Sequence, residues 1–131
     1  TGLTVERDER LVEVGYGVWA GKSPEQLKAD DPEGFAAFRA DPWRNRPADA
    51  EPMETFTERV LAAYAEHLAA PGDPLLIVAH AGVIRTVAAH TLGMPLENLY
   101  RLHLPYAGRV RIHTVDGRTR ISHLAPVPPG H

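Results

Sequence analysis

The chain has 131 residues, 44% of them hydrophobic, a formal net charge of −3 and no cysteine. This length and hydrophobic content predict one folded domain and argue against a disordered chain, and the lack of cysteine excludes a disulfide framework and a thiolate metal site. A slightly acidic chain without a basic stripe is not expected to bind nucleic acid.

No apolar run approaches the roughly 18 residues of a membrane-spanning helix. The first residues also lack the charged and then apolar pattern of a signal peptide. We therefore expect a cytoplasmic protein that does not bind a membrane. The absence of cysteine is in keeping with a reducing compartment.

The first part of the chain is predicted to consist of loops and two short helices. Residues 4–14 are expected to be extended and to lead into a glycine-rich loop at 15–21. The sequence S-P-E-Q at 23–26 combines a capping serine, a first-turn proline and the glutamine of a capping box. It predicts a helix that runs to about Ala29. A second short helix is expected to follow Asp31, which can cap it.

A proline-rich loop and a long helix are predicted next. Residues 41–52 contain three prolines and are expected to form a surface loop. Apolar residues then recur at spacings of three and four, which predicts a long helix with one apolar face. That face comprises Met53, Phe56, Val60, Leu61, Tyr64 and Leu68. The sequence P-G-D-P at 71–74 is expected to end the helix.

The following stretch joins an apolar run directly to a histidine and a helix. The five apolar residues Leu75–Ala79 predict a strand buried on both faces of a sheet. His80 would then lie at the carboxyl end of that strand, where open α/β sheets bind ligands. Ala81 and Gly82 allow close approach to the backbone, and the helix that follows, to about Leu92, offers free N–H groups that favour an anion. The alternative is an ordinary core histidine at a strand end.

The last part of the chain predicts a helical turn and an antiparallel hairpin. A short helical turn is expected at 96–100, and the alternation at 110–115 predicts a strand with one solvent-exposed face. Asp116-Gly117 is a two-residue hairpin turn, followed by a partner strand at 118–124 and a proline-rich tail at 125–131. Together these elements predict an α/β fold in which helices pack on a mixed sheet. The sheet lacks evident neighbours for its one buried strand.

Several stretches resemble motifs of the histidine phosphatase superfamily, which has the phosphoglycerate-mutase-like fold. Residues 11–21 read L-V-E-V-G-Y-G-V-W-A-G and are similar to the family loop L-x-E-x-x-x-G-x-W-x-G. Residues 76–85, L-I-V-A-H-A-G-V-I-R, followed by G-M-P-L-E-N-L at 93–99, look like its second histidine motif. Residues 101–107, R-L-H-L-P-Y-A, resemble the alpha-ribazole phosphatase branch. Residues 51–60 are similar to the tail of G-E-S-x-x-x-x-x-x-R-V, with alanine and proline replacing its glycine and serine.

The resemblance implies a three-layer fold, with helices on both sides of a mixed sheet, and a phosphatase that uses neither a cofactor nor a metal. In this family a histidine attacks a small phosphate ester, and water then hydrolyses the phosphohistidine. By motif match Glu13 is the general acid that protonates the leaving group. His80 is the second histidine, which binds the phosphoryl group together with Ala81 and Gly82. For Glu13 taken alone, an ordinary exposed carboxylate is the alternative.

The resemblance also bears on the proline-rich loop. In this fold that region can lie over the active site, so Trp43, Arg44 and Arg46 could contact the substrate. Solvated arginines on an exposed loop are the alternative. Four other histidines, His90, His103, His113 and His123, are not spaced as metal ligands are.

One feature of the family is absent from the sequence. The family's nucleophile lies in an Arg-His-Gly triplet, and none of the seven histidines here follows an arginine. We therefore expect residues 1–124 to be the C-terminal portion of a histidine phosphatase domain without its N-terminal strands, and this chain alone to be inactive. The alternatives are a homodimer in which a second copy completes the sheet, a non-catalytic domain that binds a phosphate-bearing ligand or a partner, and a phosphoglycerate mutase.

Overall fold

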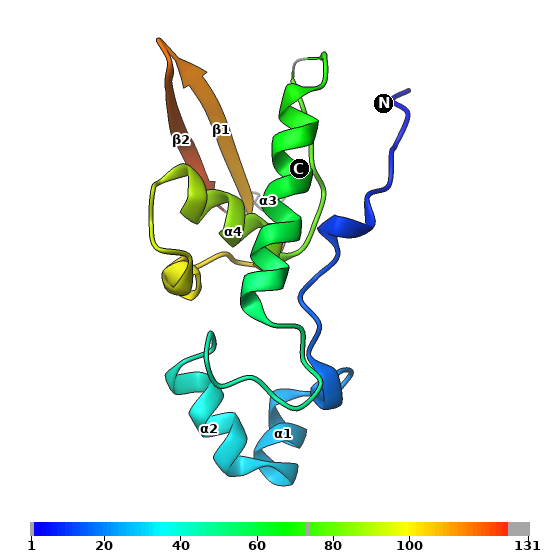
Figure 1. The fold of residues 1–131 in the computed structure, drawn as a ribbon, viewed down its shortest axis with the longest axis vertical. Helices are drawn as coiled ribbons and strands as arrows, with labels where there is room; N and C mark the ends of the chain where they lie inside the picture. Colours follow the sequence, from blue (N-terminus) through cyan, green and yellow to red (C-terminus); the bar gives the residue numbers. More distant parts are fainter. Residues whose placement is uncertain (1, 73, 126–131) are drawn as a thin grey trace. The chain divides into compact units, whose positions relative to one another are not determined.

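The computed structural model describes residues 2–72 and 74–125 (Figure 1). Within these residues it contains four α-helices, three short 3-10 helices and one antiparallel pair of strands. The chain divides into two compact units. We call Val14–Phe56 the loop unit, and Thr1–Glu13 together with Thr57–His131 the site unit.

The two short helices predicted for the loop unit are confirmed. They are α1 (Pro24–Asp30) and α2 (Pro32–Ala40). At the start of α1 the Gln26 N–H donates to Ser23 Oγ at 3.3 Å, and the Ser23 N–H donates to Gln26 Oε1 at 2.8 Å, which is a complete capping box. The carboxylate of Asp31 caps α2. Local capping chemistry thus determines where both helices begin.

An aromatic cluster forms the core of the loop unit. Trp19, at the end of the 3-10 helix η2 (Gly17–Trp19), is only 6% exposed. Its ring packs edge-on against Phe35 and Phe38, with ring centroids 6.1 Å and 5.5 Å away. Tyr16 packs edge-on against Phe38 as well. The cluster holds the glycine-rich loop against α2.

The long helix, the helix after His80 and the following helical turn are also confirmed. They are α3 (Met53–Ala69), α4 (Ala81–Thr91) and the 3-10 helix η3 (Leu96–Arg101). α3 begins in the loop unit and continues in the site unit. The buried apolar residues of the site unit are Val60, Ala63, Val83, Ala88, Ala89 and Leu99. Leu68, expected on the apolar face of α3, is instead 57% exposed.

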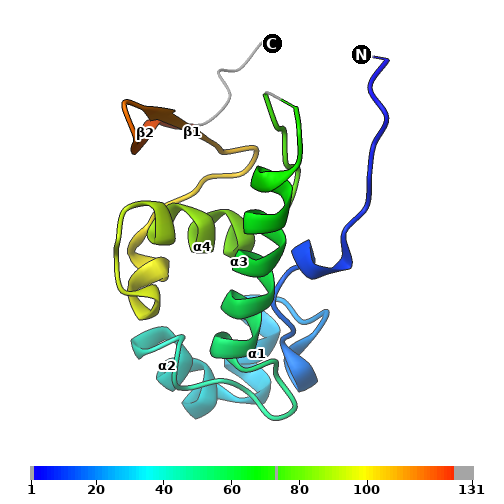
Figure 2. The ribbon, with the colours of Figure 1, turned by 45° about the horizontal axis from the view of Figure 1, so that its top comes forward.

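Within the site unit α4 lies beside α3 in both views (Figures 1 and 2). Tyr64 of α3 forms a hydrogen bond with Thr91 of α4, and burial raises the pKa of the Tyr64 phenol. α4 also packs against η3, where the Arg85 guanidinium donates to the Leu102 carbonyl at 2.9 Å and lies over the Tyr100 ring. These contacts give the helix a fixed position in its unit.

The predicted hairpin is confirmed. It consists of β1 (Arg109–Val115) and β2 (Arg118–Ala125), paired antiparallel, with Val115 opposite Arg118. The turn residues Asp116 and Gly117 have φ values of 50° and 71°, as a type I′ turn requires.

The prediction of a buried strand at Leu75–Ala79 is wrong for this structure. These residues are drawn as coil between α3 and α4 (Figure 1), and no strand pairs with them in the part of the chain that is described. Leu76 and Val78 are 79% and 88% exposed. A strand is buried on both faces only when neighbouring strands pair with both of its edges. In the described residues β1 and β2 pair only with each other, so the apolar run has no sheet to enter.

The structure describes the chain from residue 2 at one end to residue 125 at the other. The predicted extended segment at 4–14 is interrupted by the 3-10 helix η1 (Glu9–Leu11), which Asp8 caps. Of the predicted tail, Ala125 is the last residue of β2, and 126–131 lie outside the described residues. No helix in the described ranges is both long and apolar enough to cross a membrane.

Candidate functional site

Glu13 and Gly82, which the sequence places in two separate motifs, are in contact. The Gly82 N–H donates to Glu13 Oε2 at 3.1 Å across 69 positions of sequence. Both residues belong to the site unit. The predicted general acid therefore lies directly against the predicted substrate-binding backbone.

The contact is made at the N-terminus of α4. This helix begins at Ala81, and His80 is its N-cap residue with an extended backbone and no capping hydrogen bond from its own side chain. The first N–H groups of a helix have no partner within the helix and lie at its positive end. The Glu13 carboxylate satisfies one of them, so the structure places an anion where the sequence predicts an anion site. That anion is a side chain of the same protein.

His80 and Gly82 differ in their exposure. The His80 side chain is exposed, whereas Gly82 is buried. Behind Gly82 the buried Thr86 hydroxyl donates to the Gly82 carbonyl at 2.9 Å, which braces the first turn of the helix. The arrangement leaves the imidazole accessible beside a buried helix turn.

Arg59 of α3 forms hydrogen bonds with the segment that carries Glu13. Its guanidinium donates to the main-chain carbonyls of Arg10 at 2.6 Å, Val12 at 3.0 Å and Glu13 at 3.3 Å. We did not predict this role from the sequence. The only signal was the arginine of the R-V pair that ends the stretch at 51–60.

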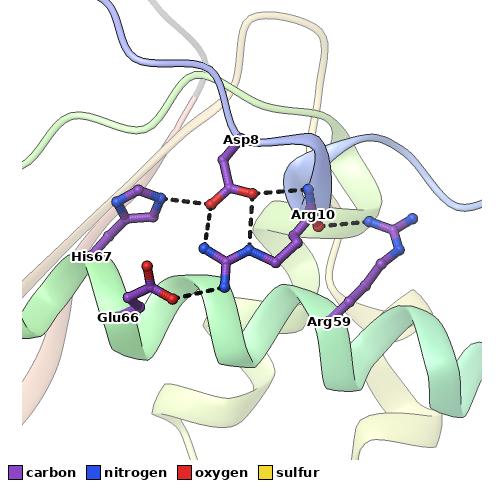
Figure 3. Close-up of polar contacts among 5 residues, drawn as sticks. All are labelled: Asp8, Arg10, Arg59, Glu66 and His67. Carbon is purple, nitrogen blue, oxygen red and sulfur yellow. Dashed lines mark hydrogen bonds and ion pairs between the residues drawn. The ribbon is translucent and has the colours of Figure 1, made fainter.

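A second set of contacts, which we call the clasp, joins the same segment to α3 at Asp8, Arg10, Glu66 and His67 (Figure 3). Arg10 binds both carboxylate oxygens of Asp8, at 2.7 Å and 3.0 Å, and Nη1 of Arg10 donates to Glu66 at 2.8 Å. His67 Nε2 lies 2.9 Å from Asp8. In the sequence, Asp8 and Arg10 stand within the run of charged residues at 6–10, and nothing there indicates their contact with Glu66 and His67.

The clasp perturbs the charged groups that form it. Hydrogen bonds from Arg10 hold the pKa of the Asp8 carboxyl far below its usual range. A hydrogen bond from Arg10 also lowers the pKa of Glu66, and the two carboxylates together raise the pKa of Arg10. The charged forms of Asp8, Glu66 and Arg10 are therefore the stable ones at neutral pH.

Trp43, Arg44 and Arg46, for which the sequence leaves substrate contact and an exposed loop as alternatives, line one groove of the loop unit with a volume of about 480 Å³. Trp43 Nε1 donates to Glu54 at 3.0 Å, and Arg44 pairs with Asp41 at 2.9 Å.

Arg46 is not a solvated arginine. Its Nη2 donates to the Gly15 carbonyl at 2.9 Å, and its guanidinium lies over the Tyr16 ring, 5.1 Å from the centroid. Contact of the three groove residues with a substrate remains a hypothesis.

Comparison with known proteins identifies the family. The family model of the histidine phosphatase superfamily (branch 1) matches residues 1–126. The chain belongs to the histidine phosphatase superfamily. The predicted family is thus confirmed, and the match extends over nearly all of this histidine phosphatase chain.

Solved structures confirm the predicted α/β, phosphoglycerate-mutase-like fold class. The alpha-ribazole phosphatase from Shigella flexneri superposes with a TM-score of 0.75 at 25% identity, over 94% of this chain and 61% of that one. A mycobacterial glucosyl-3-phosphoglycerate phosphatase in complex with inorganic phosphate gives a TM-score of 0.74 at 29% identity, over 94% of this chain and 65% of that one.

Curated relatives point to the same group of enzymes. The adenosylcobalamin/alpha-ribazole phosphatase of Salmonella typhimurium is 34% identical over 97 residues, which are 72% of this chain and 47% of that protein. The glucosyl-3-phosphoglycerate phosphatase of Mycobacterium tuberculosis is 33% identical over 108 residues, 75% of this chain and 48% of that protein. The chain spans about half the length of these two relatives.

Proposed function

We propose that this protein is a phosphomonoesterase that hydrolyses a small phosphate ester through a phosphohistidine intermediate. The observation that carries the proposal is the contact of Glu13 with the N-terminus of α4, which begins directly after His80. It joins a carboxyl group that can donate a proton, an accessible imidazole, and helix N–H groups of the kind that bind phosphate oxygens. Relatives are named as phosphatases of alpha-ribazole and of glucosyl-3-phosphoglycerate. Because these names differ in the leaving group, they support phosphate ester hydrolysis as a class and no particular substrate.

The proposed reaction has two steps. In the first, a histidine nitrogen forms a bond to phosphorus, the P–O bond to the leaving group breaks, and Glu13 gives its proton to the leaving oxygen. In the second, water attacks phosphorus, the P–N bond breaks, and the Glu13 carboxylate takes up a proton of the water. His80, Ala81 and Gly82 bind the phosphoryl oxygens, where negative charge gathers in the transition state.

The attacking histidine of this reaction is not His80. In the family it belongs to an Arg-His-Gly triplet, which does not occur in these 131 residues. We therefore assign residues 1–124 to the C-terminal portion of the complete domain, and this chain by itself should not turn over substrate.

The contact between Glu13 and Gly82 suggests how substrate binding prepares the acid. A phosphate oxygen that binds the Gly82 N–H takes the place of Glu13 Oε2, which now lies 3.1 Å from that nitrogen. A phosphate dianion and a carboxylate at one helix end repel each other. Substrate binding should thus favour the neutral acid form of Glu13, which is the form that can protonate a leaving group.

The intact mass of the product of the native gene is the first test. A mass well above 14.4 kDa, with an upstream Arg-His-Gly triplet, predicts a protein that hydrolyses p-nitrophenyl phosphate. His80→Ala should then lower kcat/KM by about 10²–10³-fold, as loss of one transition-state donor does. His90→Ala, an exposed histidine in the last turn of the same helix, is the matched control. A triplet-bearing protein without turnover would contradict the proposal.

A non-catalytic phosphate-binding domain is the second candidate, and the absence of the triplet from the sequence favours it. A native mass of 14.4 kDa would support this candidate if the protein binds inorganic phosphate without hydrolysing an ester. A phosphoglycerate mutase would instead move the phosphoryl group between positions of a glycerate.

A further inference from the structure

Arg59 contacts the main chain of the segment that carries Glu13. Its Nη1 atom donates to two carbonyls and its Nη2 atom to a third, and all three acceptors lie within residues 10–13. An arginine presents five N–H donors in a rigid planar fork, so a single side chain can hold several carbonyls in fixed places. Figure 3 shows this side chain reaching from α3 to the main chain at Arg10.

We infer that Arg59 is a positioning residue for Glu13, holding its backbone so that its carboxylate meets the N-terminus of α4. The inference rests on the proposed role of Glu13 as the general acid. One of the three carbonyls that Arg59 binds is that of Glu13 itself. Its side chain in turn accepts from Gly82. Arg59 and the Gly82 N–H therefore act on the backbone and the side chain of one residue.

Arg59 belongs to a packed part of α3. It lies between the buried residues Thr57 and Val60 on α3, and α3 is joined to α4 through Tyr64 and Thr91. Residue 13, by contrast, lies in coil, and no β-ladder fixes its direction. Where a segment has no ladder hydrogen bonds, side-chain donors or water satisfy its carbonyls, and only side-chain donors also align them to another element. Arg59 supplies these donors from α3.

The clasp anchors the same segment at its other end. Glu66 and His67 lie seven and eight positions after Arg59, which is about two helical turns, so the two anchors lie on one face of α3. The clasp acts through the side chains of Asp8 and Arg10, five and three residues before Glu13. Arg59, in contrast, binds the Glu13 main chain directly. Loss of Arg59 should therefore affect Glu13 more than loss of the clasp.

The Gly82 amide reports the position of Glu13 without any need for turnover. As a first-turn N–H, it has no partner within α4, and its hydrogen bond goes to Glu13. In the ¹H–¹⁵N spectrum of the 131-residue chain, the Gly82 signal should move as Glu13 takes up a proton in acid, and Glu13→Gln should abolish that movement. Arg59→Ala should at least halve the movement and raise Gly82 hydrogen exchange about fivefold, as loss of one hydrogen bond would.

Variants separate positioning from general stability. Glu58→Ala, an exposed change at the neighbouring position of α3, should leave the Gly82 signal as in the wild type. Asp8→Asn should disturb it less than Arg59→Ala does. Arg59→Lys keeps the charge but offers one ammonium group to three carbonyls, so it should restore the Gly82 behaviour only in part.

Two outcomes would overturn the inference. One is a wild-type Gly82 titration and exchange rate in folded Arg59→Ala. The other, which decides the matter if Arg59→Ala does not fold, is a wild-type Gly82 signal in Arg59→Lys. Binding of inorganic phosphate, followed by ³¹P NMR on the same samples, tests the proposed function separately. If the wild-type chain does not bind phosphate while its Gly82 titration is as expected, the proposed function is contradicted and the positioning role stands.

Discussion

The carboxylate of Glu13 accepts a hydrogen bond from the main-chain N–H of Gly82 at 3.1 Å. The contact brings the loop motif at 11–21 and the histidine motif at 76–85 together at the first turn of α4. It also means that the positive end of this helix already holds a negative charge. A phosphate group that binds there has to compete with the protein's own carboxylate.

We expect Glu13→Gln to bind inorganic phosphate about two- to fivefold more tightly than the wild type, because the variant removes a competing charge from the helix end. Isothermal titration at neutral pH measures the affinity. Glu58→Gln removes an equal charge from the exposed face of α3 and should leave it unchanged. Equal or weaker binding by Glu13→Gln would show that Glu13 does not compete for this site.

We expect His80→Ala to weaken phosphate binding without destabilising the protein. The side chain is exposed and makes no capping hydrogen bond, so its removal should change the free energy of unfolding by less than about 0.5 kcal/mol. Thermal unfolding and ³¹P titration measure the two effects. Unchanged phosphate binding would remove His80 from the proposed site.

Acid should release the clasp at Asp8. Arg10 lowers the folded-state pKa of this carboxyl, so its contribution to stability is complete above the ordinary aspartate pKa of about 3.9 and is lost as the pH falls through the lowered folded pKa. We expect Asp8→Asn to melt a few degrees below the wild type at neutral pH, with a difference that shrinks from about pH 4 downward. Circular dichroism melts at several pH values measure this. Asp30→Asn, which breaks an exposed pair with Lys22, is the control, and a difference independent of pH would refute the expectation.

Two glycines of the loop unit should respond differently to alanine. Gly17 has a φ of 53°, and an added Cβ would collide with the Ala48 carbonyl, whereas Gly21 has a φ of 77° and open space around it. Gly21→Ala should cost about 1 kcal/mol from backbone strain alone, and Gly17→Ala clearly more. Denaturant unfolding followed by tryptophan fluorescence compares them. Equal costs would contradict the importance of the close approach to Ala48.

The exposed apolar run at 75–79 should make the chain self-associate. Unpaired extended segments with exposed side chains such as Leu76 and Val78 are prone to pair with another chain. Sedimentation velocity should show association at micromolar concentrations, and the double change Leu76→Lys and Val78→Lys should reduce it. A stable wild-type monomer would count against both a homodimer and an incomplete sheet.

Local signals in the sequence were enough to predict most helices and the hairpin. The capping box at 23–26 and the turn at Asp116-Gly117 act within a few residues, so their outcome depends little on the rest of the chain. The motif resemblance likewise identified the family, which the match over residues 1–126 confirms.

The tertiary structure decided which residues meet and which apolar segment is buried. Glu13 and Gly82 lie 69 positions apart in the sequence. The carbonyls that Arg59 binds lie more than 45 positions before it, and no local sequence pattern predicts these hydrogen bonds. The run at 75–79 has the composition of a buried strand, yet its Leu75, Leu76 and Val78 side chains are exposed. Burial of a strand depends on neighbouring strands that hydrogen-bond with both of its edges. A local sequence pattern predicts the strand, but its neighbours have to come from other parts of the chain.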